Sequence, residues 1–377
     1  MKVAYFCDTF YPQINGVTNT LERLNAYTKA NHIDAIFLVP RYPGKVQGDD
    51  NVHRFFSIPL PFYKECRVAI PPIFKAERIL DAFKPDIIHA YSEFSISLAG
   101  IRYAKKKNIP VVSSYTSNFS YYLHYFNIEG LNPYLENYLN WFHNSCRLTF
   151  CPSDTTREYL HMKAIDRVEI MKRGVDSERF NPSHRSELFR KNVGAKEDSV
   201  IFTYVGRVSP EKDLDILAAA AKALKQKYGD RAVFVIVGDG PYLDKLKADL
   251  HGYAYFTGFL KGEALAQAYA SSDVFTFPST SETFGNVVLE AMCSGLPAIV
   301  PDSGGVREIV HDGMDGCIVP PRDENSLRRC MERFLLLPQL IANMGQSAIV
   351  SATSRSWENV FGGLFRHYER LIGKKTS

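Results

Sequence analysis

The feature that most limits how this chain can fold is an alternation of short apolar runs with helical patterns, and the alternation occurs twice. In the first half, helical patterns cover Gly16–Ala30, Phe74–Phe83 and Ser95–Lys107. The apolar runs around them are Lys2–Cys7, Ala35–Pro40, Ile87–Ala90, Val111–Ser114 and Leu148–Cys151. Strands that alternate with helices in this way predict parallel βαβ units.

A second series of the same kind begins at Val200. Its strand-like runs are Val200–Val205, Ala232–Val237, Tyr255–Phe256, Val274–Phe277, Ala298–Val300 and Gly316–Val319, and its helical patterns are Asp213–Lys227, Tyr242–Leu250, Ala264–Ala270 and Asn286–Cys293. Gly174 and Pro182 lie in the stretch that separates the two series. We therefore predict an α/β protein of two doubly wound, Rossmann-like domains, residues 1–172 and 173–355. We expect them to face each other across a cleft, because ligands bind at the carboxyl ends of such sheets.

Composition excludes several classes of protein. Of the 377 residues, 45% are hydrophobic and 23% are charged, which is typical of globular chains rather than disordered ones. The net charge is only +4, so nucleic acid is a poor candidate partner. The charge is uneven: residues 1–175 carry 21 basic and 16 acidic side chains (+5), and residues 176–377 carry 24 and 25 (−1). The basic first half predicts contact with an anionic surface.

The seven cysteines are scattered and include no Cys-x-x-Cys pair. We therefore expect reduced thiols in a cytoplasmic protein, without a disulfide framework or structural zinc. The chain begins with a strand-like run rather than with a signal peptide. No apolar run approaches the roughly 20 residues that span a bilayer. We expect a protein that is soluble or lies on a membrane surface.

Two segments interrupt the alternation of strands and helices. Ile58–Phe74 combines four prolines with aromatic residues and with the cations Lys64 and Arg67. Tyr115–Trp141 is crowded with aromatic residues. Aromatic side chains at helical spacing are usually core residues, but both segments also fit an acceptor groove or a membrane-facing surface.

The loop after the first strand is a weak candidate for an anion site. Gly16 stands where this loop turns into a helix, so that free N–H groups at the helix start can face an anion. The segment lacks the Gly-x-Gly-x-x-Gly pattern, which argues against a dinucleotide site.

A stronger candidate is the loop Gly206–Lys212. Arg207 and Lys212 follow a strand and precede a helix, and two cations in these positions suit a diphosphate. A pair of solvated surface cations would show the same sequence pattern. Asp213 and Asp215 form an Asp-x-Asp pattern that fits a metal site, but at a helix start these carboxylates more simply favour the helix dipole. We expect no metal.

The strongest signal is the segment Ser279–Glu290, which joins a strand to a helix. Glu282 falls in the loop and Glu290 within the helix, with seven residues between them. The backbone N–H groups of Phe284, Gly285, Asn286 and Val287 are those that a helix start leaves without intrahelical partners, so they can bind phosphate or sugar oxygens. The two carboxylates can then accept hydrogen bonds from sugar hydroxyls on either side.

With these residues in place, the chain resembles a retaining glycosyltransferase of family 4 with the two-domain GT-B fold. The resemblance covers Phe10–Gly16, Arg173–Asp176 with Phe180 and Pro182, Gly206–Lys212, Gly238–Pro241, Gly258, Glu282–Glu290, and Gly304-Gly305 with Glu308. It implies that Glu282 contacts the transferred sugar, that Glu290 holds the ribose, and that Arg207 and Lys212 bind the diphosphate. It also implies that Gly16 approaches the phosphates and that a final helix, about residues 356–377, crosses back onto the first domain.

Within that family, Asp8–Leu24 and Pro59–Pro71 look most like the branch that glycosylates membrane lipids, including diacylglycerol glucosyl- and mannosyltransferases. That branch usually carries Ser-Tyr-His-Thr-Asn-Phe, whereas Thr116 stands here in the place of the histidine. We expect the acceptor and sugar side to include Thr116, and with it Asn118, Tyr122 and His124.

The resemblance implies transfer of a hexose from UDP-glucose, UDP-galactose or GDP-mannose, with retention, to a hydroxyl acceptor. We expect a lipid acceptor, no required cofactor, and a peripheral position at the inner face of an anionic membrane. Three alternatives stay open: transfer to a soluble or polysaccharide acceptor, a sugar-nucleotide epimerase of the same fold, and a non-catalytic nucleotide-sugar-binding module.

Overall fold

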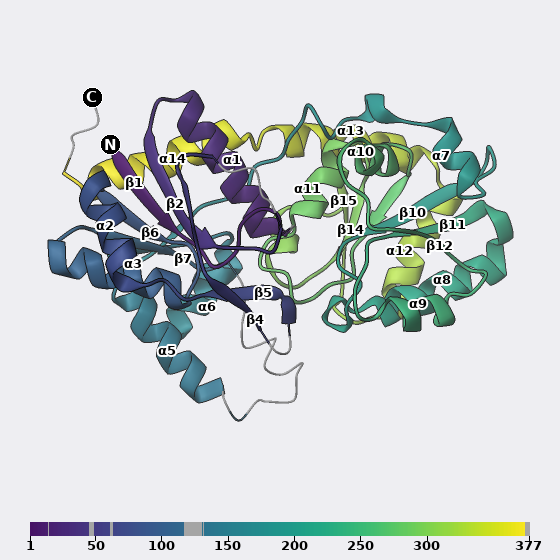
Figure 1. Ribbon diagram of the computed structural model, residues 1–377. Helices are drawn as coiled ribbons and strands as arrows, with labels where there is room; N and C mark the ends of the chain where they lie inside the picture. Colours follow the sequence, from purple (N-terminus) through teal and green to yellow (C-terminus); the bar gives the residue numbers. More distant parts are fainter. Residues whose placement is uncertain (14, 45–48, 61–62, 117–129, 131, 374–377) are drawn as a thin grey trace. The chain divides into compact units, whose positions relative to one another are not determined.

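The computed structural model describes residues 1–377 with the exception of residues 14, 45–48, 61–62, 117–129, 131 and 374–377 (Figure 1). The side chains of residues 60–66 are also left out of the description. The chain packs into two compact units. One comprises Met1–Arg173 and Glu358–Ser377, and the other comprises Gly174–Trp357. The sequence placed this division after residue 172 and the return to the first domain at about residue 356.

The first unit is built on a parallel sheet of seven strands in the order β3-β2-β1-β6-β7-β8-β9. The strands are β1 (Lys2–Phe6), β2 (Asp34–Pro40), β3 (Val52–Phe55), β6 (Ile87–Ala90), β7 (Val111–Ser114), β8 (Leu148–Cys151) and β9 (Val168–Ile170). The helices are α1 (Gly16–Ala30), α2 (Ile73–Phe83), α3 (Ser95–Lys107), α5 (Asn132–Asn144), α6 (Asp154–Met162) and α14 (Trp357–Leu371). The central strands are buried along nearly their whole length, which is why they read as continuous apolar runs.

The last helix, α14, belongs to the first unit in its packing, and Figure 1 shows it (yellow) running along that unit. Phe365 stacks on Tyr27 of α1 with ring centroids 5.6 Å apart. The hydroxyl of Tyr368 lies 2.5 Å from Nδ1 of His89 at the core of the sheet. Buried aromatic contacts therefore hold the end of the chain against its beginning.

The two segments that interrupted the sequence pattern have local structures of their own. Ile58–Phe74 contains most of an antiparallel hairpin, β4 (Ser57–Leu60) and β5 (Tyr63–Ala69), followed by the start of α2. The second segment ends in α5. Tyr115 is buried, whereas Tyr134 and Trp141 on α5 are exposed, so the described part of this segment is only partly core.

The second unit has a parallel sheet of six strands in the order β12-β11-β10-β13-β14-β15. The strands are β10 (Val200–Val205), β11 (Ala232–Val237), β12 (Tyr255–Gly258), β13 (Val274–Thr276), β14 (Ala298–Pro301) and β15 (Gly316–Val319). The helices are α7 (Glu187–Asn192), α8 (Leu214–Tyr228), α9 (Leu243–Asp249), α10 (Gly262–Ala270), α11 (Asn286–Cys293), α12 (Glu324–Leu336) and α13 (Gln339–Thr353). The α/β fold class with two Rossmann-like domains is thus confirmed.

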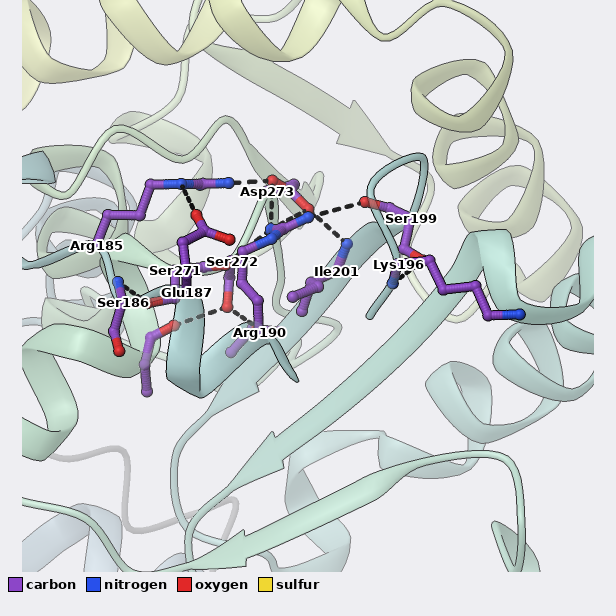
Figure 2. A network of polar contacts seen from close by, with 12 residues as sticks. Arg185, Ser186, Glu187, Arg190, Lys196, Ser199, Ile201, Ser271, Ser272 and Asp273 are labelled. Atoms are coloured by element: carbon purple, nitrogen blue, oxygen red, sulfur yellow. Dashed lines mark hydrogen bonds and ion pairs between the residues drawn. The ribbon is translucent and has the colours of Figure 1, made fainter. Parts of the chain in front are cut away.

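A mostly buried ion pair ties α7 to this second sheet (Figure 2). Arg190 donates from one Nη to both carboxylate oxygens of Asp273, at 3.0 and 2.9 Å, and from the other Nη to the carbonyl of Ser199 at 3.0 Å. Asp273 also accepts from the backbone N–H of Ile201 at 2.7 Å. Both charges are satisfied by the fold, and neither is left over for a ligand.

Candidate active site

The loop after β10 is held against the loop after β11. The N–H of Gly206 donates to the carbonyl of Val237 at 3.0 Å, and the N–H of Val208 donates to the carbonyl of Asp239 at 2.9 Å. A Cβ on Gly238 would collide with the carbonyl oxygen of Gly206, so this close approach requires glycine. The packing places Arg207 at the carboxyl edge of the sheet, as the sequence predicted.

Lys212 and Glu282 come together in the structure, although 70 residues separate them. The Nζ of Lys212, at the end of the short helical turn Pro210–Lys212, contacts Oε1 of Glu282. Their side chains are only 15% and 25% exposed, so the two charges interact with less screening than on an open surface. The hydroxyl of Ser281 donates to the carbonyl of Glu211 at 2.9 Å, which binds the two loops together at the same point.

Asp213 has a structural role that the sequence did not reveal. Its buried carboxylate accepts from the N–H and the hydroxyl of Thr280, at 3.0 and 2.7 Å, and from Nε of Arg322 at 2.8 Å. Asp213 therefore fastens the Glu282 loop to the start of α8. Asp215 is exposed in the first turn of α8, as the helix-dipole interpretation expected. Within the described ranges, no group of three or more His, Cys, Asp or Glu side chains is arranged to hold a metal ion.

The N-cap residue of α11 is Gly285, which supplies no side-chain capping bond. Its φ is +100°, a conformation that favours glycine. A Cβ at Gly285 would also lie 2.6 Å from Cγ1 of Val306. Phe284 is buried, whereas Asn286 and Val287 are partly exposed in the first turn. The backbone N–H groups at this helix start, with the positive end of the helix dipole, can hold an anion.

Glu290 lies in the next turn of α11. Its Oε2 accepts a hydrogen bond from the hydroxyl of Tyr269 on α10 at 3.0 Å. Burial, and after it the charge of Glu290, raise the pKa of Tyr269 well above its ordinary value, so this hydroxyl stays protonated and donates. The bond fixes one oxygen of the carboxylate and thereby orients the other.

Gly258 and Gly16, both predicted to bind the donor, lie in different units of the chain. Gly258 ends β12, and its carbonyl accepts from the N–H of Gly238 at 2.9 Å, so it belongs to the same carboxyl edge of the second sheet. Gly16 is exposed at the first position of α1 in the first unit. The side chain of Asn15 caps α1 by accepting from the N–H of Thr18 at 2.9 Å, so the protein itself satisfies part of that helix start.

The acceptor side is described only in part. Thr116 is partly buried just after β7, while Asn118, Tyr122 and His124 lie outside the described residues. Sequence reasoning missed a buried polar cluster at the carboxyl edge of the first sheet, formed by Asp8, Ser92 and Glu93 with His143. Only the positions of Asp8 and Glu93 in the sequence could have indicated this cluster, because both residues closely follow the ends of strands β1 and β6.

Asp8 stands out within this cluster. The hydroxyl of Ser92 donates to Asp8 Oδ2 at 2.8 Å, and the N–H of Ala69 donates to Oδ1 at 3.2 Å. Burial raises the pKa of Asp8 to about 7 in spite of these two bonds, with a smaller contribution from the charge of Glu93. Oε1 of Glu93 lies 3.5 Å from Nε2 of His143. The cluster can therefore hold or release a proton near neutral pH.

Two Rossmann-like units, with cations and carboxylates gathered at the carboxyl edge of the second sheet, define the class of protein: a GT-B glycosyltransferase that uses a nucleotide sugar. The comparisons with known proteins agree. The profile of "Glycosyltransferase Family 4" matches residues 14–179, and that of "Glycosyl transferases group 1" matches residues 185–350. The chain belongs to glycosyltransferase family 4, and its relatives are hexosyltransferases.

Two relatives and one solved structure illustrate this. A GDP-mannose-dependent alpha-mannosyltransferase of Mycobacterium tuberculosis is 31% identical, over 100% of this chain and 98% of that protein. The alpha-monoglucosyldiacylglycerol synthase of Streptococcus pneumoniae is 30% identical, over 84% of this chain and 75% of that protein. HepE of Anabaena, solved in complex with UDP-glucose, shares the fold with a TM-score of 0.77, over 98% of this chain and 100% of that chain at 19% identity.

Proposed function

We propose that this protein transfers a hexose from a nucleoside diphosphate sugar, with retention of configuration, to a hydroxyl of a membrane lipid of the diacylglycerol type. The observation that carries the proposal is the contact between Lys212 and Glu282. A glycosyl phosphate bond has a sugar on one side and a diphosphate on the other. A carboxylate that accepts from sugar hydroxyls and a cation that binds phosphate, held side by side, match the two sides of that bond.

The proposed roles follow from these positions. Arg207, Lys212 and the helix start at Phe284–Val287 stabilise the charge of the leaving nucleoside diphosphate. Glu282 orients the sugar, and Glu290, held by Tyr269, accepts from the ribose. Gly258 lies on the same edge and supplies backbone rather than a side chain. This arrangement supplies positive potential from protein groups, so we propose that the reaction requires no metal.

Retention is supported by the names of the relatives. GDP-mannose and UDP-glucose carry their sugars in the α configuration, and both relatives named above are described as forming alpha products. An α donor that gives an α product is retention. We propose a front-side reaction, in which the departing phosphate receives the proton of the acceptor hydroxyl.

The lipid acceptor is supported by an exposed apolar surface in the first unit, which we call the hairpin surface. It consists of Phe56 (64% exposed), Ile58, Ile70, Ile73 and Phe74 (87% exposed). Apolar side chains that protrude beside basic ones favour binding to the interface of an anionic bilayer. Among the described residues no single helix is long and apolar enough to cross a membrane; one sharply bent pair, α12 with α13, satisfies the criterion by length and composition only.

The cations expected to contact lipid are not equivalent. Arg67 donates from Nε to the hydroxyl of Ser57 at 2.8 Å and from Nη2 to its carbonyl at 2.7 Å, so it braces the hairpin. Lys75 lies over the ring of Phe55, with Nζ 5.8 Å from the centroid. The side chain of Lys64 lies outside the described residues. We propose a peripheral position at the cytoplasmic face, where the six described cysteines, all free and buried, stay reduced.

The test is incubation of the purified protein with UDP-glucose, UDP-galactose and GDP-mannose, each with and without diacylglycerol vesicles. We expect nucleoside diphosphate release that depends on the lipid, and a glycolipid whose anomeric proton shows the α configuration. A β-linked product would refute retention. Transfer that is equally fast to a soluble sugar or glycan acceptor would instead support the alternative acceptor class.

An epimerase of the same fold would release nucleotide without any acceptor and would change the configuration of the free sugar, so the lipid-free arm of this experiment detects it. A binding module would bind nucleotide and turn over nothing. The close contact of Lys212 with Glu282 argues against a degenerate site.

A further inference from the structure

The first unit contains a cavity of about 300 Å³ that has no role in the proposed transfer reaction. It lies between helix α1 and strand β3, next to the loop after β1. Its lining includes Tyr11 of that loop, Glu22, Asn25, Ala26 and Lys29 of α1, and Asp49 and Arg54 at β3. The cavity therefore combines an exposed aromatic ring with charged and amide groups, a set that binds small polar molecules rather than apolar ones.

Arg54 is the unusual member of this lining. It is partly buried one residue from the end of β3, with its guanidinium 5.7 Å from the ring centroid of Phe10. Nη1 donates to the carbonyl of Pro40 at a long 3.4 Å, and the buried Nε has no hydrogen-bond partner. A guanidinium has five N–H donors, and buried donors are normally satisfied. Arg54 is thus short of acceptors.

The neighbouring carboxylate does not compensate this charge. Asp49 pairs with Lys29 at 2.8 Å and accepts from Nδ2 of Asn25 at 2.8 Å, and the bond from Lys29 is the largest of the contributions that lower the pKa of Asp49. No ion pair joins Arg54 to a carboxylate in the described part of the chain. Burial lowers the pKa of Arg54, and of its neighbours only Tyr42 offsets this. Glu22 of α1 is a second carboxylate of the lining, and it too forms no ion pair with Arg54 in the described part of the chain. The cavity therefore holds a partly desolvated cation that is not ion-paired, beside two carboxylates.

We propose that this cavity binds a phosphate group of a small polar ligand, with Arg54 holding the phosphate oxygens. Arginine presents a planar fork that matches two oxygens of a phosphate, and the ring of Phe10 holds the fork in place. The carboxylates of Asp49 and Glu22 lie in the same lining and can accept from hydroxyls carried by the ligand, whereas the amide of Asn25 is engaged by Asp49 and Asn51. The inference rests on this cavity alone and does not depend on the donor site of the second unit.

Two sources supply such a group: the head of an anionic glycerolipid or a soluble phosphorylated molecule. The sequence position of the cavity favours the lipid, because Phe56 of the hairpin surface follows Arg54 by two residues. The shared chemistry is a phosphate with adjacent hydroxyls. Glycerol phosphate presents both and is the probe of choice, and glycerol is its uncharged counterpart.

The test is calorimetric titration of glycerol phosphate, and of glycerol, into the full chain and three variants. Arg54→Gln removes the cation, and Ala26→Phe fills the cavity from an exposed helix position without changing charge. Arg102→Gln removes an exposed arginine of α3 in the same unit and serves as the control. We expect saturable binding of glycerol phosphate, weakened at least about tenfold by Arg54→Gln and by Ala26→Phe but not by Arg102→Gln. Glycerol should not bind.

A second arm identifies the source of the phosphate. Vesicles of phosphatidylglycerol and of phosphatidylcholine are sedimented with the same proteins. Loss of the preference for phosphatidylglycerol in Arg54→Gln points to the lipid head, and an unchanged preference together with lost glycerol phosphate binding points to a soluble ligand. If the full chain binds neither probe, or if Ala26→Phe and Arg54→Gln bind as well as the control, the proposal is wrong. Should Arg54→Gln fail to fold, Ala26→Phe decides, and a failure of sugar transfer bears on none of these results.

Discussion

Replacing Glu290 by alanine separates the two glutamates of the candidate donor site. In the structure Oε2 of Glu290 accepts from Tyr269, and the carboxylate lies in the second turn of α11. Glu282 lies in the preceding loop against Lys212. If Glu290 binds ribose and Glu282 binds the sugar, the two variants differ in their affinity for free nucleoside diphosphate, which carries ribose but no transferred sugar.

The magnitude follows from the bond that is lost. A hydrogen bond to a charged group contributes about 1.5–3 kcal/mol, which corresponds to a loss of about 10- to 150-fold in affinity. Glu290→Ala also leaves the hydroxyl of Tyr269, which is fully buried, without its acceptor, at a cost of about 1–3 kcal/mol in stability. Tyr269→Phe is the matched control, because it removes the orienting bond and keeps the carboxylate. We expect it to weaken nucleotide binding less than Glu290→Ala does.

Calorimetric titration of UDP and GDP, with steady-state kinetics on the active donor, measures both effects. Glu282→Ala should bind nucleoside diphosphate nearly as well as the unchanged protein and should lose kcat, the mark of an interaction made mainly in the transition state. Glu290→Ala should lose affinity for nucleoside diphosphate and for intact donor alike. Equal loss of nucleotide affinity in the two variants would refute the division of roles. It would mean that both carboxylates act on the same part of the ligand.

Other predictions concern stability, membrane binding, donor choice and pH. Arg190→Ala removes the nearer cation from the mostly buried Asp273 and leaves Arg185 at 3.9 Å, so it should lower the free energy of unfolding by about 3 kcal/mol, the low end of the range for breaking a buried pair, in urea titration; a loss below about 1 kcal/mol would show that the pair is not structural. Phe74→Ser should reduce co-sedimentation with anionic vesicles, whereas Leu188→Ser, also exposed but in the second unit, should not. Thr116→His should change the preference among glucose, galactose and mannose donors more than it changes nucleotide affinity, and unchanged preferences would remove Thr116 from the sugar site. The pKa of Asp8 is raised from 3.8 to about 7 in the folded state, so between these pH values the folded state binds a proton that the unfolded state has lost. The free energy of unfolding therefore falls as pH rises through this range. Asp8→Asn should lose this dependence, which urea unfolding at about pH 5 and about pH 8 measures.

Much of the fold could be predicted from local pattern. Runs such as Val111–Ser114 and Val200–Val205 are strands with the expected bounds, since a strand buried on both faces must be apolar along its whole length. Val52–Phe55 was missed because β3 is the edge strand of its sheet and is only partly buried, so its residues His53 and Arg54 break the apolar pattern. The hairpin of β4 and β5 was missed because its described apolar residues do not share one face with the core: Ile58 is exposed, whereas Ala69 is buried.

By itself the sequence determined the class of protein and most of the candidate donor residues, because these depend on short segments. A strand, a loop and a helix start are local structures, and Gly206–Lys212 and Ser279–Glu290 each contain one complete example. Only the tertiary structure decided which groups meet. Strand order brings Lys212 to Glu282 and Asp213 to Thr280, and it brings Asp8 to Ser92 across 84 residues. Such pairings depend on which strands are neighbours in a sheet and on how deeply each loop is buried. Burial also raises the pKa of Asp8 to about 7, and burial is a property of the packed chain rather than of any segment.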